Sequence, residues 1–327
     1  MYVLGIDGGG TKTAGIVADE FGTIYMQAVT GRSNPTTLSP QEFEQVMVGL
    51  VEELKTQNEA VFNQISVCFA GMAGVDESKR TAEVMQLLKT HLPDEIEVIV
   101  QNDAVNALYS GTLGKPGIAQ ISGTGSIAFG INEKGETTRA GGWGFLFDEG
   151  GSGFAIGKAA LRAVFQAFDK RGPETSLTAR LLEHFGVKIV PDIIAHVYGH
   201  EYARAVIAPL AQLVVNEALA GDKIAHQILM EACGDMLLCI DTCHKQLFAP
   251  DHSTAIVLAG GVFSDWALFD DLFKRLARGT LPNAVFQPTR IPPVGGAVIA
   301  GLKSHGITIR EQFTERLNEQ VMDAVNA

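Results

Sequence analysis

Asp7-Gly8-Gly9-Gly10-Thr11-Lys12-Thr13 is a turn of three consecutive glycines between two predicted strands, residues 2–7 and 13–18. Because glycine has no Cβ, this backbone can approach a phosphate closely, and Thr11 adds a hydroxyl donor. An aspartate at a strand end, here Asp7, is able to hold a hydrated Mg²⁺ ion. A Walker A loop does not fit, because Thr11 precedes Lys12 and a strand follows in place of a helix. The turn therefore predicts a phosphate-binding hairpin.

The elements around this turn follow the order βββαβαβα. After the two strands of the hairpin we expect a strand at 23–29, a helix at 40–55, a strand at 65–70, a helix at 77–90, a strand at 96–100 and a helix to about 110. Ser39-Pro40 favours a helix start, since proline suits the first helical position.

A similar order restarts at residue 117. It comprises strands at 117–122, 125–131 and 136–140, a mostly helical stretch at 152–246, a strand at 254–259, a helix at 265–278, a short strand at 284–287 and a helix at 295–304. A last helix is expected at about 308–325. We predict an α/β protein of two coupled lobes, 1–113 and 114–327, with a ligand cleft between them and a helical insertion in the second.

Composition limits the partners and the location. Acidic residues number 37 against 25 basic ones, which gives a net charge of −12 and argues against nucleic acid as a partner. We find no signal peptide and no apolar run of the roughly 20 residues that a membrane span needs, so we expect a cytoplasmic protein without membrane contact. The four cysteines form no CxxC pair, and we expect idle reduced thiols.

A second glycine turn, Ser122-Gly123-Thr124-Gly125-Ser126, also joins two predicted strands. A dinucleotide-binding pattern, GxGxxG/A ending at Ala128, requires a helix next, whereas residues 127–131 alternate as a strand does. We predict a second hairpin with a hydroxylated tip. Two such hairpins, one at the start of each lobe, favour a polyphosphate held from two sides.

Asn102-Asp103 lies where a strand ends and a helix begins. Both residue types are common N-caps, and position alone favours that role for Asp103. A general base at the end of a strand that faces the cleft is the functional alternative.

The densest glycine cluster contains Gly141-Gly142-Trp143-Gly144 and residues 148–153. A tryptophan among glycines is better suited to offer a flat surface to a ring than to fill a core. The nearby acids, and Asn34 in a loop, are able to bind hydroxyls. Gly260-Gly261 follows a strand and precedes a helix, which suits a nucleoside lying against bare backbone.

Five motifs together resemble the BadF/BadG/BcrA/BcrD ATPase family, in its N-acetylglucosamine kinase branch, within the actin, sugar-kinase and heat-shock-chaperone ATPase superfamily. They are DGGGTKT (7–13), ND (102–103), SGTGS (122–126), GGWG (141–144) and AGG (259–261). The resemblance covers nearly the whole chain and implies two ribonuclease H-like lobes, as in actin-like ATPases. The zinc motif of repressor-type sugar kinases is absent.

The resemblance implies roles for individual residues. ATP and its phosphates would be bound by Asp7, Gly9, Gly10, Thr11, Lys12, Thr124, Gly260 and Gly261, with Asp7 holding Mg²⁺ through water. Asp103 would be the catalytic base. The sugar would be bound by Asn34, Asp103, Ser126, Gly142, Trp143, Gly144 and an acid from the pair Asp148 and Glu149.

The acid pair departs from the family pattern. The family reads GDEGS after GGWG, whereas this chain reads Phe147-Asp148-Glu149-Gly150-Gly151-Ser152. A gapless alignment puts Glu149 at the sugar-binding position, and a shift of one residue puts Asp148 there. Both assignments stay open.

The implied activity is phosphorylation of an amino sugar by ATP and Mg²⁺, on N-acetylglucosamine or N-acetylmuramic acid at the 6-hydroxyl, in cell-wall or chitin salvage. A homodimer is expected from the family. One alternative is a glucosamine kinase. Another is an activator ATPase of the same family coupled to an iron–sulfur enzyme, although no second cysteine lies near Cys68 in the sequence. A non-catalytic sugar sensor is a third.

Overall fold

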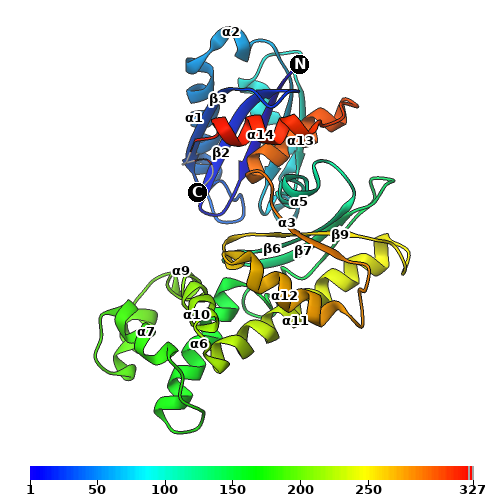
Figure 1. Cartoon of the computed structure of the whole chain (residues 1–327). Coiled ribbons are helices and arrows are strands. Elements are labelled where there is room, and N and C mark those ends of the chain that lie inside the picture. The colour runs from blue at the N-terminus through cyan, green and yellow to red at the C-terminus, as the bar shows by residue number, and fades with distance from the viewer. Residues whose placement is uncertain (323–324, 326–327) are drawn as a thin grey trace. The chain divides into compact units, whose positions relative to one another are not determined.

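The computed structural model describes residues 1–322 and 325 (Figure 1). The chain divides into two compact units: the first is Met1–Lys115 together with the segment from Thr289 onward, and the second is Pro116–Pro288. The expected lobes were 1–113 and 114–327. The structure differs from that division, because the segment from Thr289 onward belongs to the first unit.

The first unit is built on a five-stranded sheet of order β3-β2-β1-β4-β5. Its strands are β1 (Tyr2–Gly8), β2 (Lys12–Asp19), β3 (Ile24–Gly31), β4 (Ile65–Met72) and β5 (Glu97–Gln101). The first three strands form an antiparallel meander, and β4 and β5 run parallel to β1. Because β1 is the central strand, Leu4 and Ile6 are fully buried in the core of this unit.

Helices α1 (Pro40–Gln57), α2 (Glu59–Phe62), α3 (Val75–Ser78), α4 (Thr81–His91) and α5 (Ala104–Thr112) connect and follow the strands. Ser39 caps α1 in a capping box with Glu42, as the Ser39-Pro40 pair indicated. The single helix predicted at 77–90 is wrong. Lys79 has a left-handed backbone, with φ of 56°, which ends α3 before α4 begins.

Two C-terminal helices, α13 (Pro293–Ser304) and α14 (Glu311–Gln320), complete the first unit. Glycines let α13 pack closely: a Cβ on Gly296 would lie 2.0 Å from the Asn106 carbonyl oxygen of α5, and one on Gly301 would lie 2.6 Å from Val3 Cγ1 of β1. This close packing joins the segment after Thr289 to the first sheet. The end of the helix predicted at 308–325 includes residues 323–324, which lie outside the described part of the chain.

The second unit repeats the same topology with the sheet order β10-β9-β6-β7-β8. Its strands are β6 (Gly117–Ser122), β7 (Ser126–Ile131), β8 (Thr137–Ala140), β9 (Ala255–Ala259) and β10 (Val285–Pro288). Strands β6, β7 and β8 form an antiparallel meander, and β9 and β10 are parallel to β6. The predicted duplication of an α/β unit is confirmed.

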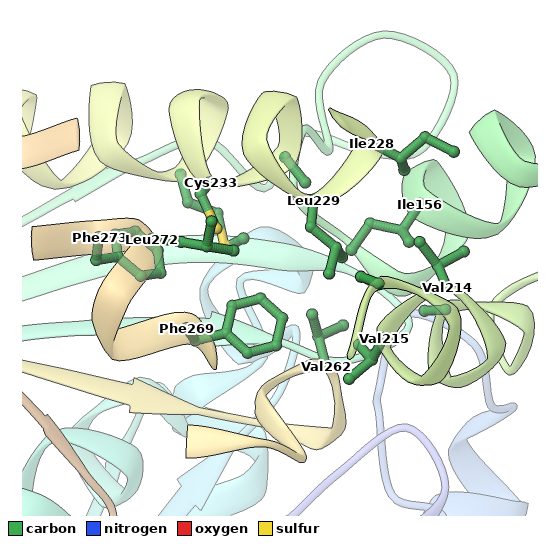
Figure 2. Packing of buried hydrophobic residues seen from close by; sticks show 14 of the residues in the cluster. Ile156, Val214, Val215, Ile228, Leu229, Cys233, Val262, Phe269, Leu272 and Phe273 are labelled. Carbon is green, nitrogen blue, oxygen red and sulfur yellow. The ribbon is translucent and has the colours of Figure 1, made fainter. Parts of the chain in front are cut away.

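Helices fill the connection between β8 and β9, where the insertion was predicted. They are α6 (Gly153–Phe168), α7 (Leu177–Phe185), η1 (Val190–Asp192), α8 (Ile193–Tyr198), α9 (Ala203–Ile207), α10 (Leu210–Leu219) and α11 (Lys223–Leu247), and η2 (Gly261–Phe263) and α12 (Trp266–Ala277) follow β9. Figure 2 shows their shared core, in which Leu229 of α11, Val215 of α10 and Phe269 of α12 lie close together.

Within the described residues, no single helix has the length and apolar character to cross a membrane. One bent pair, Ala203–Leu219 with Lys223–Leu247 at 120°, meets that test by length and composition alone.

Candidate active site

The first loop, residues 7–13, is the turn of the β1–β2 hairpin. The Gly9 backbone N–H donates to the Lys12 carbonyl at 2.9 Å, which closes the turn. A Cβ added at Gly10 would meet no described atom within 4 Å, and Thr11 is exposed. The tip therefore has open space beside bare backbone. Lys12 Nζ donates to the Val325 carbonyl oxygen at 3.2 Å.

Asp7 lies at the end of β1 beside a residue that sequence reasoning missed. Asn106 Nδ2 of α5 donates to Asp7 Oδ1 at 2.7 Å. Burial raises the pKa of Asp7 from 3.8 to about 6, although the Asn106 hydrogen bond and the Lys12 charge oppose this shift. The buried Oδ1 atom of Asn106 has no hydrogen-bond partner among the described residues. Oxygen acceptors of this kind fit the waters of a hydrated Mg²⁺ ion.

Asn102 and Asp103 have separate tasks at the start of α5. The Asn102 Oδ1 atom accepts the Ala104 backbone N–H at 3.0 Å, whereas the Asp103 side chain makes no capping hydrogen bond. Asn102 Nδ2 in turn donates to Asp76 Oδ2 of α3 at 3.2 Å. Asp103 thus occupies the N-cap position, as its place in the sequence predicted, but the side chain that accepts the first helical N–H is that of Asn102.

Asn34 lies in the loop after β3 and packs against the turn before α3. Its Oδ1 atom accepts the backbone N–H of Thr36 at 2.9 Å. The same atom would be 2.4 Å from a Cβ on Gly74, whose φ of +75° also requires glycine. Asn34 thus contacts Gly74, which precedes Asp76, the partner of Asn102, by two residues in the chain. The first unit gathers Asn34 and the Asn102-Asp103 pair around α3.

The second loop, residues 122–126, is the β6–β7 turn and is held by the start of α6. The Gly153 N–H donates to the Gly123 carbonyl at 2.7 Å. Ser122 Oγ donates to the Gly151 carbonyl. Thr124 is exposed at the tip, whereas Ser126 is buried and its Oγ accepts from Gln120 Nε2 at 2.9 Å. Thr124 is thus the accessible hydroxyl of this loop.

The Gly260-Gly261 turn touches the second loop directly. Gly260 has a φ of +107°, and a Cβ there would lie 2.4 Å from the Ser122 carbonyl oxygen, so only glycine fits. At Gly261 an added Cβ would meet no described atom within 4 Å. Open backbone at Gly261 suits the approach of a flat ligand.

Trp143 is 61 % exposed, in keeping with a ligand surface rather than a core residue. The Arg139 guanidinium of β8 lies over its ring, 4.3 Å from the ring centroid. Gly142 and Gly144 on either side have φ of +75° and +115°. These backbone conformations turn the chain sharply at the tryptophan, and Arg139 holds its ring.

Asp148 and Glu149 have different neighbours. Glu149 Oε2 accepts from Arg204 Nη2 of α9 at 2.7 Å, and its Oε1 atom would be 3.1 Å from a Cβ on Gly125. Burial raises the pKa of Glu149, and Arg204 opposes that shift. Asp148 is close enough to Asp235 of α11 for its negative charge to raise the pKa of that carboxyl.

Four residues beside the predicted ones were not found from the sequence. Asn106 follows Asp103 by three residues in a helix, a spacing that puts both on one face and that was a usable signal. Asp76, Arg139 and Arg204 carry no local pattern that distinguishes them from other surface charges.

The two sheets, each with a glycine-rich hairpin beside its central strand, define the ribonuclease H-like class of nucleotide-binding α/β protein. The model of the BadF/BadG/BcrA/BcrD ATPase family matches residues 4–301. The chain therefore belongs to this family, as its motifs predicted.

Two similar proteins match this chain over nearly their whole length. The chain is 30% identical over 298 residues to the N-acetylmuramic acid/N-acetylglucosamine kinase of Clostridium acetobutylicum, covering 91% of this chain and 97% of the relative. It is 32% identical over 311 residues to the N-acetyl-D-glucosamine kinase of Dictyostelium discoideum, covering 92% and 98%. A crystal structure of a candidate N-acetylglucosamine kinase from Chromobacterium violaceum has a TM-score of 0.71 at 24% identity, covering 91% and 98%, and supports the fold.

Proposed function

We propose that this protein is an ATP-dependent kinase of an amino sugar. The observation that carries the proposal is the arrangement at α5, where Asn102 accepts the first helical N–H and the Asp103 side chain makes no capping hydrogen bond. A carboxylate at that place, in a chain of this ATPase family, is suited to accept the proton of an attacking hydroxyl. The names of the Clostridium and Dictyostelium relatives support an amino sugar as the acceptor.

The phosphate groups of ATP are assigned to the two hairpin loops. Thr11 and Thr124 are exposed hydroxyls at their tips, and an added Cβ at the preceding Gly10 or Gly123 would meet no described atom within 4 Å. Gly260 and Gly261 are assigned to the adenosine. In phosphoryl transfer most of the rate comes from positioning and charge stabilisation, which is what such loops supply.

Mg²⁺ is assigned to Asp7 through water. When bound, the ion would neutralise charge on the phosphates. The protein's part is to hold the Asp7 carboxylate in place through Asn106 Nδ2, at 2.7 Å.

The sugar is assigned to Asn34, Asp103, Ser126, Trp143 with its flanking glycines, and the Asp148-Glu149 pair. We propose N-acetylglucosamine, N-acetylmuramic acid or both as substrate, with transfer to the 6-hydroxyl, as in cell-wall or chitin salvage. The homodimer and the cytoplasmic location stay predictions.

An activator ATPase is the second candidate within the family. Its cluster requires several cysteine thiolate ligands. Cys68 is fully buried in β4, and burial raises its pKa strongly, which favours a packing role. The buried Cys68 therefore favours the kinase over the activator ATPase as the proposed function.

The deciding experiment is a coupled ADP-release assay with N-acetylglucosamine, N-acetylmuramic acid, glucosamine and glucose. We expect ADP release that depends on one of the first two sugars, and NMR of the product to place phosphate on O6. Hydrolysis of ATP at the same rate without any sugar would refute the kinase proposal and favour the activator.

A further inference from the structure

An ion pair connects the helical insertion to the second loop. Arg204 belongs to α9, and Glu149 precedes α6, 55 residues earlier in the chain. Arg204 Nη2 and Glu149 Oε2 are 2.7 Å apart, and the Glu149 side chain is only 10 % exposed. The other carboxylate oxygen, Oε1, lies beside Gly125 of the second loop.

The guanidinium of Arg204 is itself held by aromatic rings. It lies over the Phe145 ring at 4.8 Å and 6.0 Å from the centre of the Phe154 ring. These two rings contact each other edge to face, with centroids 5.4 Å apart. A stacked guanidinium loses few orientations when it binds a carboxylate, so the pair is preorganised.

Two glycines of α6 bring α9 close enough for this contact. A Cβ on Gly157 would lie 2.1 Å from the Ile207 carbonyl oxygen, and one on Gly153 would lie 3.1 Å from the Ala208 carbonyl oxygen. Gly153 also donates its N–H to Gly123 of the second loop at 2.7 Å. The start of α6 is therefore packed against α9 on one side and bonded to the second loop on the other.

We propose that Arg204 is a positioning residue that holds the Glu149 carboxylate beside the second loop in the orientation required for sugar binding. The inference rests on the proposed function, because it takes Glu149 as the sugar-facing acid. Through Arg204, the helical insertion would then contribute to sugar binding.

The charges around Glu149 explain why it needs this partner. Burial and the nearby Asp148 both favour the protonated form of Glu149, and Arg204 is the group that favours the carboxylate. Without the guanidinium, Glu149 would take up a proton closer to neutral pH. A protonated acid is a weaker acceptor for sugar hydroxyls and no longer has a fixed orientation.

The same insertion supplies a matched control. Arg180 Nε and Glu217 Oε1 are also 2.7 Å apart, and Glu217 is 7 % exposed. Arg180 lies in α7 and Glu217 in α10, and neither is assigned to substrate. Arg180→Met removes a pair of equal length with a similarly buried carboxylate, together with a second contact from Arg180 to Glu183 at 3.3 Å, and it does not touch the second loop.

The experiment compares Arg204→Met, Arg204→Lys and Arg180→Met with the parent protein. Sugar KM, ATP KM and kcat come from ADP release, sugar Kd from calorimetry between pH 6 and pH 9, and melting temperature from calorimetric scans. For Arg204→Met we expect sugar Kd to rise about tenfold or more at pH 7, in line with a disrupted charged hydrogen bond, and ATP KM to change little. We expect its sugar affinity to recover as pH rises and Glu149 ionises. Arg204→Lys should lose less sugar affinity than Arg204→Met does.

A double variant separates positioning from direct contact. If Arg204 acts through Glu149, Arg204→Met has little further effect on sugar Kd in a Glu149→Gln background. Equal effects of Arg204→Met and Arg180→Met on sugar Kd would overturn the proposal, as would a loss confined to N-acetylmuramic acid, whose carboxylate Arg204 would then contact. Should Arg204→Met not fold, Arg204→Lys and the double variant with lysine give the same comparison. A parent protein that phosphorylates no sugar refutes the proposed function instead.

Discussion

Asn102 accepts the backbone N–H of Ala104 at 3.0 Å through its Oδ1 atom, and this contact satisfies the start of α5. The neighbouring Asp103 makes no capping bond to that helix. Asn and Asp have similar capping propensities, but here only the Asn102 side chain accepts a helical N–H. Stability of α5 is expected to depend on Asn102, and chemistry on Asp103.

Asp103→Asn and Asn102→Ala therefore form a matched pair. We expect Asp103→Asn to lower kcat by about 10²–10⁴-fold, the usual worth of a general base, while the protein still binds sugar and keeps its melting temperature. Asn102→Ala is expected to cost roughly 0.5–2 kcal/mol in free energy of unfolding, as the loss of a helix cap does. Steady-state kinetics and urea unfolding measure both. Near-normal turnover of Asp103→Asn would remove Asp103 from the mechanism.

Asp7 is expected to make the ligand-free protein less stable as pH rises. Its folded pKa of about 6 lies above the ordinary 3.8, so the unfolded chain loses this proton first. The penalty is absent below pH 3.8, grows between 3.8 and 6, and is complete above. At pH 7 it amounts to about 3 kcal/mol, at about 1.36 kcal/mol for each pKa unit.

Asp7→Asn removes this penalty, so it should be more stable than the parent at pH 7 and equal to it near pH 4. Urea unfolding without Mg²⁺ or ATP at a series of pH values gives the difference. The exposed Asp271→Asn on α12 serves as control and should show no such trend. A difference in free energy of unfolding between Asp7→Asn and the parent that stays constant with pH would contradict the raised pKa of Asp7.

Gly157→Ala tests the close contact between α6 and α9. The new Cβ would lie 2.1 Å from the Ile207 carbonyl oxygen, so backbone must move, and we expect a loss of roughly 1–3 kcal/mol. Gly234→Ala in α11 is the control, because its Cβ would meet no described atom within 4 Å. That change should stabilise by up to about 1 kcal/mol through helix propensity. Equal effects of the two alanines on thermal unfolding would contradict the packing.

The features that depend on neighbouring residues could be predicted from the sequence. Most of the meander strands are short, nearly continuous apolar runs, and the glycine turns between them span only a few residues, so the strands of both five-stranded units were predicted. The family followed from motifs of the same short length, and the family model confirmed it. The break between α3 and α4 was missed because it depends on one backbone angle, that of Lys79.

Contacts between residues that are far apart in the chain could not be predicted from the sequence. Asn106 reaches Asp7 across 99 residues and Arg204 reaches Glu149 across 55, and no spacing rule connects either pair. The return of α13 to the first unit depends on where its glycine face packs. The glycines were visible in the sequence, but their partners, the Asn106 carbonyl and the Val3 side chain, were not.

Trp143→Ala is expected to raise sugar KM several-fold and leave ATP KM nearly unchanged. An aromatic contact contributes roughly 0.5–1.5 kcal/mol beyond its buried area, and the substitution leaves both phosphate loops intact. Leu146→Ala is the control, because this neighbour is 78 % exposed and is assigned no ligand. A larger effect on ATP than on sugar would reverse the assignment of Trp143.

The last prediction decides between the two acids after the GGWG motif. Glu149 lies beside Gly125 and is paired with Arg204, whereas Asp148 is near Asp235 and raises the pKa of that carboxyl. Glu149→Gln should therefore weaken sugar binding by roughly 1–3 kcal/mol, the usual cost of losing a hydrogen bond to a charged group. Asp148→Asn should have a smaller effect on sugar binding. Because it removes a repulsion, it should leave the melting temperature equal or higher.

Calorimetric titration of sugar into each variant distinguishes the two alignments. The gapless alignment gives Glu149 the sugar-facing place, and the one-residue shift gives it to Asp148. A larger loss of sugar affinity in Asp148→Asn would establish the shifted alignment. It would also separate the Arg204 pair from sugar binding, because Glu149 would then have a structural role only. A larger loss in Glu149→Gln, with ATP affinity retained in both variants, would place the buried acid of the ion pair at the sugar.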